Sequence, residues 1–311
     1  MSLEPCICGD WGTSRLRLSL CAGERVLERR EGPGIGALRE PAAEALRPLM
    51  AGWMARLPIF LCGMAGSRNG WRESPYLPCP ADLRVLAGAA LRFEWEGTQV
   101  AIAAGLSCTS RLGTPEVMRG EETQMAGALA LRPGLGTGRH LLCLPGTHTK
   151  WAWLEDGVVR DFLTALTGEL FALLREGSTL TRAARPCAEG QGDDLPACAE
   201  REGEDGFESG LETAATLGSA SLLHAIFAAR SRQLLEGRSH EWALSYLSGL
   251  LIGSDVQGAL ALFAAPGEVV LIGDLALTRR YARALRRSGL GVSCLEGEPC
   301  ALAGLRSLAR P

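Results

Sequence analysis

The sequence predicts an α/β fold of two domains, on the basis of its length, a break near its middle and a pattern that occurs on both sides of that break. At 311 residues the chain can form two domains of about 150 residues each. Residues 132–138 are rich in glycine and contain a proline, which is typical of a domain boundary. We therefore expect one domain over residues 1–134 and a second over residues 139–311.

The repeated pattern is a strand, a turn, an alternating strand and a third strand. In the first half these are residues 6–8, 10–13, 15–20 and 26–28, and the second half repeats them at 141–144, 146–148, 151–154 and 158–162. Asp156-Gly157 supplies the positive φ angles of a type I′ hairpin turn. The unit that carries Gly12-Thr13-Ser14 is thus predicted to recur at Gly146-Thr147-His148. A chance similarity between two common hairpins is the alternative.

The remaining elements follow from the periodicity of the apolar residues. Buried strands are expected at 59–62, 100–103, 269–272 and 292–295, and helices at about 40–54, 119–131, 168–174, 207–236, 243–264, 278–287 and 300–308. Residues 186–206 are rich in glycine and acidic side chains, which favours an exposed loop with a solvated surface.

Composition excludes several classes of function. The formal net charge of −3 provides no basic surface for nucleic acid, and the chain has neither an 18-residue apolar stretch nor a basic, apolar leader at its start. The eleven cysteines are scattered, with no spacing typical of a zinc or iron–sulfur site. Reduced thiols and a cytoplasmic location are expected.

The two Gly-Thr turns are candidate phosphate-binding sites. Glycine allows the backbone to approach a phosphate closely, and the hydroxyl groups of Thr13, Ser14, Thr147 and Thr149 would add donors. Neither turn is a Walker A loop, because G-x-x-x-x-G-K-[ST] is absent. Two hairpins that face each other across a cleft would hold a phosphate chain from both sides. Asp10, at the end of the first strand, could then hold a magnesium ion directly or through water.

Lys150 is the only lysine among the 32 lysine and arginine residues, and it ends the second of these turns. A lineage that favours arginine explains its rarity but not its position. A compact ammonium group can reach a phosphate oxygen, or a substrate carboxylate, that the rigid guanidinium fork would overshoot. The sequence leaves both partners open.

A third element has the pattern of a nucleotide pocket beside a helix N-terminus. It consists of the strand that ends at Ile272, the pair Gly273-Asp274 and the helix that follows. An ordinary β–α connection is the alternative.

Several acidic and basic side chains are candidates for the end of the site where the substrate would react. Glu121 and Glu122 open a helix, where a carboxylate could accept the proton of an attacking hydroxyl, or could simply complement the helix dipole. Asp161 and Glu169 are rival bases. The guanidinium groups of Arg68, Arg72 and Arg119 could bind a substrate carboxylate in bidentate fashion.

The order of these elements resembles the actin/hexokinase/Hsp70 ATPase superfamily, whose members have two ribonuclease-H-like domains with ATP in the cleft between them. Four segments (8–13, 63–71, 117–124 and 144–151), followed by Thr167-Gly168-Glu169, resemble the 2-dehydro-3-deoxygalactonokinases through nearly the whole chain. The resemblance implies magnesium-dependent transfer of phosphate from ATP to the C6 hydroxyl of 2-dehydro-3-deoxygalactonate, in galactonate breakdown.

The resemblance also implies a set of site residues. Asp10 is expected to bind the metal, Glu121 to act as the base and Lys150 as a catalytic cation. The residues expected to contact the substrate are Arg68, Arg119, Glu122 and Glu169. ATP and its phosphates are assigned to Gly12, Thr13, Ser14, Arg15, Gly146, Thr147, His148, Thr149, Gly273 and Asp274.

Other functions stay open at this point. They are an exopolyphosphatase-like phosphohydrolase and a kinase of another sugar acid, such as 2-dehydro-3-deoxygluconate. A sugar-responsive repressor is disfavoured, because the first phosphate turn begins too near the start of the chain to leave room for a helix-turn-helix. The expected partners are small molecules, and a homodimer is kept as a candidate assembly.

Overall fold

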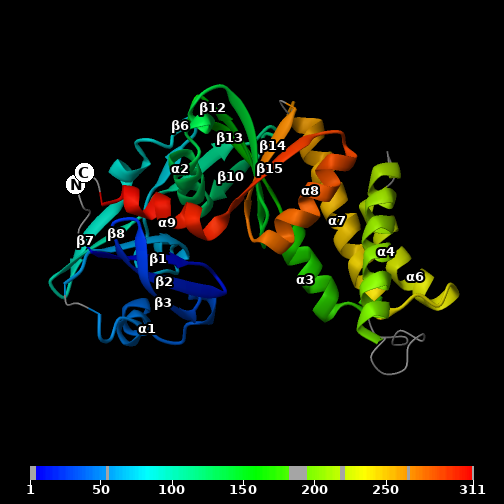
Figure 1. Ribbon diagram of the computed structural model, residues 1–311, viewed down its shortest axis with the longest axis horizontal. Coiled ribbons are helices and arrows are strands. Elements are labelled where there is room, and N and C mark those ends of the chain that lie inside the picture. Colours follow the sequence, from blue (N-terminus) through cyan, green and yellow to red (C-terminus); the bar gives the residue numbers. More distant parts are fainter. Residues whose placement is uncertain (1–4, 54–55, 182–194, 218–220, 265–266, 310–311) are drawn as a thin grey trace. The chain divides into compact units, whose positions relative to one another are not determined.

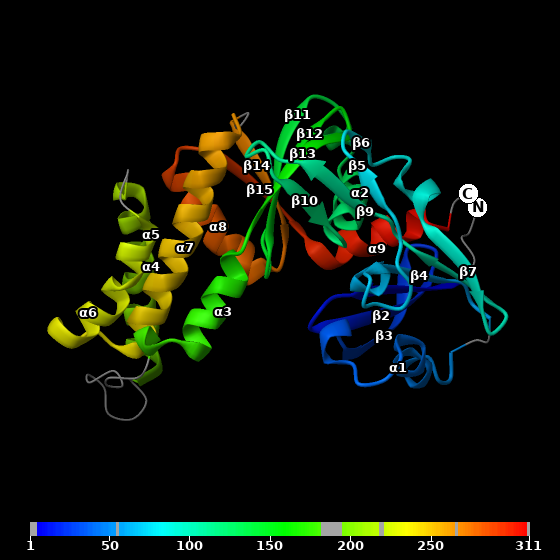
Figure 2. The same ribbon diagram turned by 180° about the vertical axis from the view of Figure 1, so that it is seen from behind.

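The fold is mixed α/β (Figures 1 and 2). The computed structural model describes residues 5–53, 56–181, 195–217, 221–264 and 267–309, without the side chains of residues 195–198. Among the described helices, none combines the length and apolar character needed to cross a bilayer. The nine cysteines that it describes are free thiols, as expected.

The first sheet has the strand order β3-β2-β1-β4-β8-β7. Its strands are β1 (Cys6–Trp11), β2 (Arg15–Ala22), β3 (Arg25–Pro33), β4 (Ile59–Gly63), β7 (Leu91–Trp95) and β8 (Thr98–Ile102). β1 runs antiparallel to β2 and parallel to β4, so that Asp10 lies opposite Cys62 and Trp11 opposite Gly63. The carboxyl ends of β1 and β4 therefore meet at one edge, which is where ligands bind in open parallel sheets.

The second sheet has the order β15-β14-β11-β12-β13-β6. Its strands are β6 (Ala81–Asp82), β11 (Arg139–Leu144), β12 (Thr149–Glu155), β13 (Val158–Ala165), β14 (Glu268–Gly273) and β15 (Gly291–Glu296). The order β13-β12-β11-β14-β15 repeats the β3-β2-β1-β4-β8 order of the first sheet. This confirms the predicted repeat, and the positive φ angles of Asp156 and Gly157 confirm the predicted turn between β12 and β13.

A small third sheet was not predicted. It has the order β10-β9-β5 and consists of β5 (Tyr76–Pro78), β9 (Gly105–Thr109) and β10 (Pro115–Met118). These strands of three to five residues are too short for a pattern of alternating residues to be recognised.

Nine helices lie within the described residues, in most of the predicted places. They are α1 (Ala42–Leu49), α2 (Glu121–Leu131), α3 (Thr167–Gly177), α4 (Leu195–Thr216), α5 (Leu222–Ile226), α6 (Ala228–Leu235), α7 (His240–Leu262), α8 (Leu275–Arg287) and α9 (Gly297–Ser307). α1 ends before the predicted residue 54, because Pro48 interrupts its hydrogen bonds and Gly52 has a positive φ angle. α8 begins earlier than predicted, since Asp274 caps it. The helix predicted over 207–236 is divided among α4, α5 and α6.

The loop predicted over residues 186–206 is wrong from Leu195 onward, because α4 begins there; residues 186–194 lie outside the described residues. α4 packs along α7 (Figures 1 and 2). A Cβ atom on Gly206 would lie 2.3 Å from the carbonyl oxygen of Trp242, and one on Gly210 would lie 2.2 Å from that of Tyr246. These glycines are sites of close helix packing.

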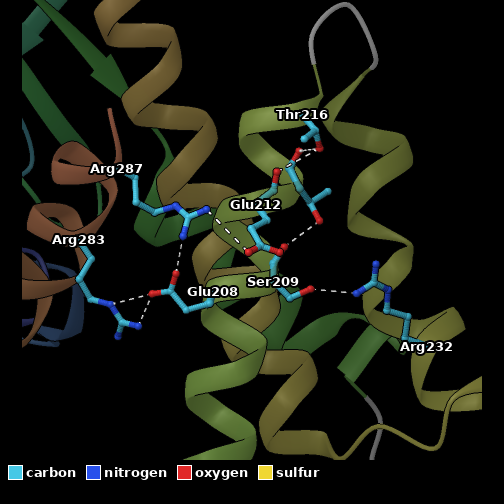
Figure 3. A network of polar contacts seen from close by, with 8 residues as sticks. Glu208, Ser209, Glu212, Thr216, Arg232, Arg283 and Arg287 are labelled. Carbon is cyan, nitrogen blue, oxygen red and sulfur yellow. Dashed lines mark hydrogen bonds and ion pairs between the residues drawn. The ribbon is translucent and has the colours of Figure 1, made fainter. Parts of the chain in front are cut away.

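An acidic residue of α4 also joins a neighbouring helix. Glu208 forms ion pairs with Arg283 and with Arg287 of α8, the latter at 2.8 Å (Figure 3). Ser209 Oγ accepts a hydrogen bond of 2.9 Å from Arg232 of α6 on the other side of the helix (Figure 3). Exposed ion pairs add little stability one by one, but this network connects three helices.

The described chain forms two compact units: residues 1–142, 152–163 and 295–311 in the first, and residues 143–151 and 164–294 in the second. The first therefore includes the C-terminal helix α9, although the predicted division at 134–139 assigns it to the second domain. The reason is packing: Leu302, Leu305 and Leu308 join the core on one face of the first sheet, and a Cβ on Gly304 would lie 2.0 Å from the carbonyl oxygen of Thr123 in α2. The domain boundary itself stays a prediction.

Candidate active site

In the first unit, Asp10 lies at the end of β1, beside the end of β4. Its Oδ2 atom lies 3.6 Å from Arg17 Nη1, and its Oδ1 atom lies 3.8 Å from the thiol of Cys62. Burial raises the pKa of Asp10, and the positive charge of Arg17 opposes that rise. The side chain keeps 24% of its surface exposed, so it can still reach a ligand.

The first Gly-Thr turn, residues 12–15, joins β1 to β2 and exposes Thr13, Ser14 and Arg15. The N–H group of Gly12 donates to Arg15 O at 2.9 Å. A second segment supports the turn, because Ile35 N donates to Gly12 O at 3.0 Å and Gly36 N donates to Thr13 O at 2.9 Å. The sequence around Gly34 is thus a brace for the predicted phosphate turn.

Gly34→Ala is expected to destabilise the fold by at least about 1–3 kcal/mol, the usual cost of overpacking. A Cβ atom there would lie 2.3 Å from Arg15 N and from Thr13 O, and backbone atoms cannot rotate away. Urea unfolding of the variant and the wild type measures the difference. Gly88→Ala is the matched control, because nothing lies within 4 Å of its Cβ position. An equal loss of stability in both variants would contradict the proposed support of the first turn by the segment around Gly34.

The start of α2 lies against the end of β4. A Cβ atom on Gly120, whose φ is 112°, would lie 3.3 Å from Gly63 Cα. The half-buried Glu121 opens the helix, and its Oε2 atom accepts the N–H of Arg119 at 3.2 Å. Asp10 and the start of α2 therefore both adjoin the same strand end, since Asp10 Oδ1 lies 3.5 Å from the Cβ position of Gly63.

Glu122 differs from its neighbour because it is completely buried. Its Oε2 atom accepts the N–H of Gly120 at 2.6 Å, and its Oε1 atom accepts the hydroxyl of Thr123 at 2.8 Å. Burial, with a smaller effect of the charge on Glu121, raises the pKa of Glu122 to about 7. The geometry gives Glu122 an internal role that orders the start of α2, and its predicted contact with substrate has no support from these bonds.

Glu122 is expected to make stability depend on pH. Its pKa of about 7 in the folded chain exceeds the ordinary value of 4.5, so the folded state binds more protons between these values and loses stability as pH rises toward 7. The contribution lost is about 3 kcal/mol. Urea unfolding at pH 5, 6, 7 and 8 should show that Glu122→Gln lacks this fall, whereas the exposed control Glu73→Gln retains it. Parallel profiles for the wild type and Glu122→Gln would contradict the assignment.

The two arginines assigned to the substrate lie in different surroundings. The guanidinium group of Arg119 lies 4.1 Å from the centre of the Tyr76 ring, and it donates to Ser74 O at 2.9 Å and to Tyr76 OH at 3.3 Å. Ser74 Oγ accepts a third bond from the same group. Arg119 is thus held in place with two of its five N–H bonds left over. Arg68 is 87% exposed and its nearest acid, Glu73, is 3.9 Å away.

In the second unit, the turn at residues 146–148 is exposed and lies against the start of α3. A Cβ atom on Gly168 would lie 2.3 Å from Gly146 O, and Glu169 N donates to Thr147 O at 2.9 Å. His148 Nε2 and Glu169 Oε2 form a hydrogen bond. Glu169 of α3 therefore pairs with the turn through His148. The rival base Asp161 lies in the first unit, where it pairs with Arg111 at 3.2 Å.

Thr149 and Lys150 point into the fold. Thr149 is fully buried, and Lys150 is 5% exposed with its Nζ atom 2.8 Å from Thr164 Oγ1 of β13. The predicted phosphate contact of Thr149 would require its hydroxyl to leave Tyr281 OH, 2.9 Å away. The catalytic role of Lys150 stays a prediction.

A cavity of about 320 Å³ lies next to the second turn, entirely within the second unit. It is lined by Gly146, Thr147, Thr167, Gly168, Phe171, Ser248, Leu251, Ile252, Leu277, Arg280 and Tyr281. Gly273 and Asp274 precede the helix that forms one wall, and Asp274 caps it through Ala276 N at 2.9 Å. The sequence did not single out Ser248 or Arg280, which form a hydrogen bond of 2.9 Å, because a lone polar residue in a helix gives no signal.

Comparison with known proteins decides the family. Residues 10–308 match the model of the 2-keto-3-deoxy-galactonokinase family. The chain belongs to this family. A Rhizobium meliloti (strain 1021) relative, named "Probable 2-dehydro-3-deoxygalactonokinase DgoK1", is 36% identical over 97% of this chain and 95% of its own length. The 2-dehydro-3-deoxygalactonokinase of Escherichia coli (strain K12) is 34% identical over 96% of each chain. The resemblance drawn from the motifs is thereby confirmed.

Solved structures agree with this membership. A crystal structure of a 2-dehydro-3-deoxygalactonokinase protein from Sinorhizobium meliloti has a TM-score of 0.81 and 35% identity, and 98% of each chain is covered. The activator of the 2-hydroxyisocaproyl-CoA dehydratase from Clostridium difficile, solved with ADPNP, has a TM-score of 0.51 at 13% identity, with 98% of this chain and 94% of that one covered. The second likeness shows the fold alone. With the repeated strand order, it confirms the predicted α/β fold with two actin-like halves.

Proposed function

We propose that this member of the 2-keto-3-deoxy-galactonokinase family transfers the γ-phosphoryl group of ATP to the C6 hydroxyl of 2-dehydro-3-deoxygalactonate. The observation that carries the proposal is the family match over residues 10–308, together with relatives of that name at 34–36% identity. The products would be ADP and 2-dehydro-3-deoxy-6-phosphogalactonate, in galactonate breakdown. The expected cytoplasmic location and homodimer stay predictions.

The cavity of the second unit is the proposed nucleotide site. Phe171, Leu251, Ile252 and Leu277 give it an apolar wall that suits adenine, and Ser248 with Arg280 provides a polar end. The backbone of Gly146 and Thr147 and the first turn of α3 line the same cavity, where N–H groups favour an anionic phosphate. Thr13, Ser14 and Arg15 are exposed on the first turn and are proposed as further phosphate donors.

Asp10 fits the proposed magnesium ion. The ion favours oxygen ligands and commonly takes only one or two carboxylates from a protein beside the nucleotide phosphates, and Asp10 offers a partly exposed carboxylate at a strand end. When bound, magnesium would neutralise charge on the phosphate oxygens. Arg17 holds the carboxylate in place.

The proposed proton acceptor is Glu121, whose position is fixed by the N–H of Arg119. Its carboxylate would take the proton of the C6 hydroxyl as the hydroxyl oxygen bonds to the γ-phosphorus and the bond to ADP breaks. Arg119 is proposed to bind the substrate carboxylate, because its guanidinium group is already held by Ser74 and Tyr76. Arg68 has no comparable anchor and would close onto the substrate from the surface.

A coupled ADP-release assay on a panel of sugar acids tests the proposal. Turnover is expected with 2-dehydro-3-deoxygalactonate, and at a lower kcat/KM with 2-dehydro-3-deoxygluconate, which differs at one stereocentre. A preference for the gluconate compound would revise the substrate. If none of the sugar acids in the panel were phosphorylated, and inorganic phosphate were released from ATP without any acceptor, the result would contradict a kinase and favour a phosphohydrolase.

A further inference from the structure

Asp255 of α7 is a half-buried carboxylate that none of the roles above uses. Three side chains from three other elements donate hydrogen bonds to it: Trp151 Nε1 at 2.8 Å, Thr167 Oγ1 at 2.7 Å and Tyr281 OH at 2.6 Å. Trp151 belongs to β12, Thr167 begins α3 and Tyr281 belongs to α8. All residues of this cluster lie in the second unit.

The cluster extends by one more bond to the second turn. The hydroxyls of Thr149 and Tyr281 lie 2.9 Å apart. Because Tyr281 already donates its proton to Asp255, the hydroxyl of Thr149 must be the donor in this bond. Asp255 therefore holds β12 at two points, directly through Trp151 and indirectly through Thr149.

The side chains that surround Asp255 are almost completely buried. Thr149 and Trp151 have no exposed surface, Tyr281 has 1% and Thr167 has 9%. Burial raises the pKa of Asp255, and the three donors oppose that rise by stabilising the carboxylate. Buried polar groups are costly unless every partner is in place, so the cluster favours one arrangement of the four elements.

The same elements build the proposed nucleotide site. Thr167 and Tyr281 line the 320 Å³ cavity themselves, along with Gly146 and Thr147. Gly168 leaves no room between the start of α3 and Gly146, since a Cβ there would lie 2.3 Å from the Gly146 oxygen. A shift of Thr167 would thus move the turn whose N–H groups are proposed to bind phosphate.

We propose that Asp255 is a positioning residue for nucleotide binding, which fixes the second Gly-Thr turn and the start of α3 before ATP arrives. This rests on the proposed function of the cavity as the nucleotide site. The carboxylate does not touch ATP. It acts by holding Thr167, Tyr281 and β12, so that the phosphate-binding N–H groups need no rearrangement on binding.

Asp255→Asn tests the proposal. The amide keeps the size of the side chain but turns an NH₂ group toward one of the three donors. Isothermal titration of the folded variant with ADP, without sugar acid, is expected to show affinity at least about tenfold lower. The KM for ATP should rise by a similar factor, while the KM for the sugar acid stays within about twofold. Tyr281→Phe removes one of the three donors to Asp255, together with the link to Thr149, but leaves the bonds from Trp151 and Thr167 in place, so it should give a smaller change of the same kind.

Asp205→Asn is the matched control. Asp205 Oδ2 also accepts an indole N–H, from Trp242 at 2.8 Å, but it joins α4 to α7 and touches no residue of the cavity. This variant is expected to lose some thermal stability and to keep wild-type affinity for ADP. An Asp255→Asn variant with normal affinity, or with an equal rise in both KM values, overturns the positioning role alone. Absence of ADP binding by the wild type overturns the proposed nucleotide site as well.

Discussion

Asp10→Asn is expected to lower kcat/KM by at least about a hundredfold, which corresponds to about 3 kcal/mol of transition-state stabilisation. The substitution keeps the size of the side chain and removes its negative charge, and with it the proposed ligand for magnesium. Stability should not fall. Since burial raises the pKa of Asp10, the neutral amide is easier to accommodate at this position than the carboxylate.

The measurement is steady-state kinetics at saturating magnesium, together with thermal unfolding. Asp82→Asn is the matched control. Asp82 is also a strand aspartate that pairs with an arginine, at 2.8 Å between its Oδ2 atom and Arg84 Nη2, and it has no proposed role in catalysis. Near wild-type turnover of Asp10→Asn would remove Asp10 from the site. A loss of activity that is accompanied by an equal loss of folded protein would give it a structural role instead.

The second large effect is expected from Glu121→Gln, with a fall in kcat of about 10²- to 10⁴-fold, the usual contribution of a general base. The amide oxygen of glutamine can still accept the N–H of Arg119, which Glu121 accepts at 3.2 Å, so the start of α2 should keep its geometry. Only the proton acceptor is lost. The KM values for both substrates should therefore change much less than kcat.

Comparison with other acids makes this test specific. Glu122→Gln is expected to act mainly on the pH dependence of stability, because Glu122 is buried. Asp161→Asn and Glu169→Gln should retain most activity, since Asp161 pairs with Arg111 and Glu169 with His148. If one of these two variants lost turnover while Glu121→Gln retained it, the base would be that residue and not Glu121.

Local patterns predicted the strands and turns of the site well. The alternation of residues along β2 and β12 and the Asp156-Gly157 pair are short-range signals. The structure confirms the strand or turn that each of them predicted. The repeat of the first hairpin in the second also followed from such signals, because the same turn chemistry recurs after a buried strand. The reaction was predicted from the combination of family motifs, because no single turn could identify it.

Long-range packing was not visible in the sequence. Gly206 lies at the end of the stretch predicted as a loop, yet this glycine and Gly210 allow α4 to approach α7 closely. Asp255 gave no signal, because its partner Trp151 lies 104 residues away. Lys150 stood out by its rarity, but its ammonium group is inside the fold on Thr164, a contact that composition could not reveal.

The central claim is that the chain transfers phosphate from ATP to the C6 hydroxyl of a sugar acid. The most direct test is ³¹P and ¹³C NMR of the product formed from 2-dehydro-3-deoxygalactonate and ATP. One equivalent of ADP and a phosphate ester on C6, seen as phosphorus coupling to that carbon, is the predicted result. Inorganic phosphate with unchanged sugar acid, or a phosphate ester on another carbon, would contradict the claim.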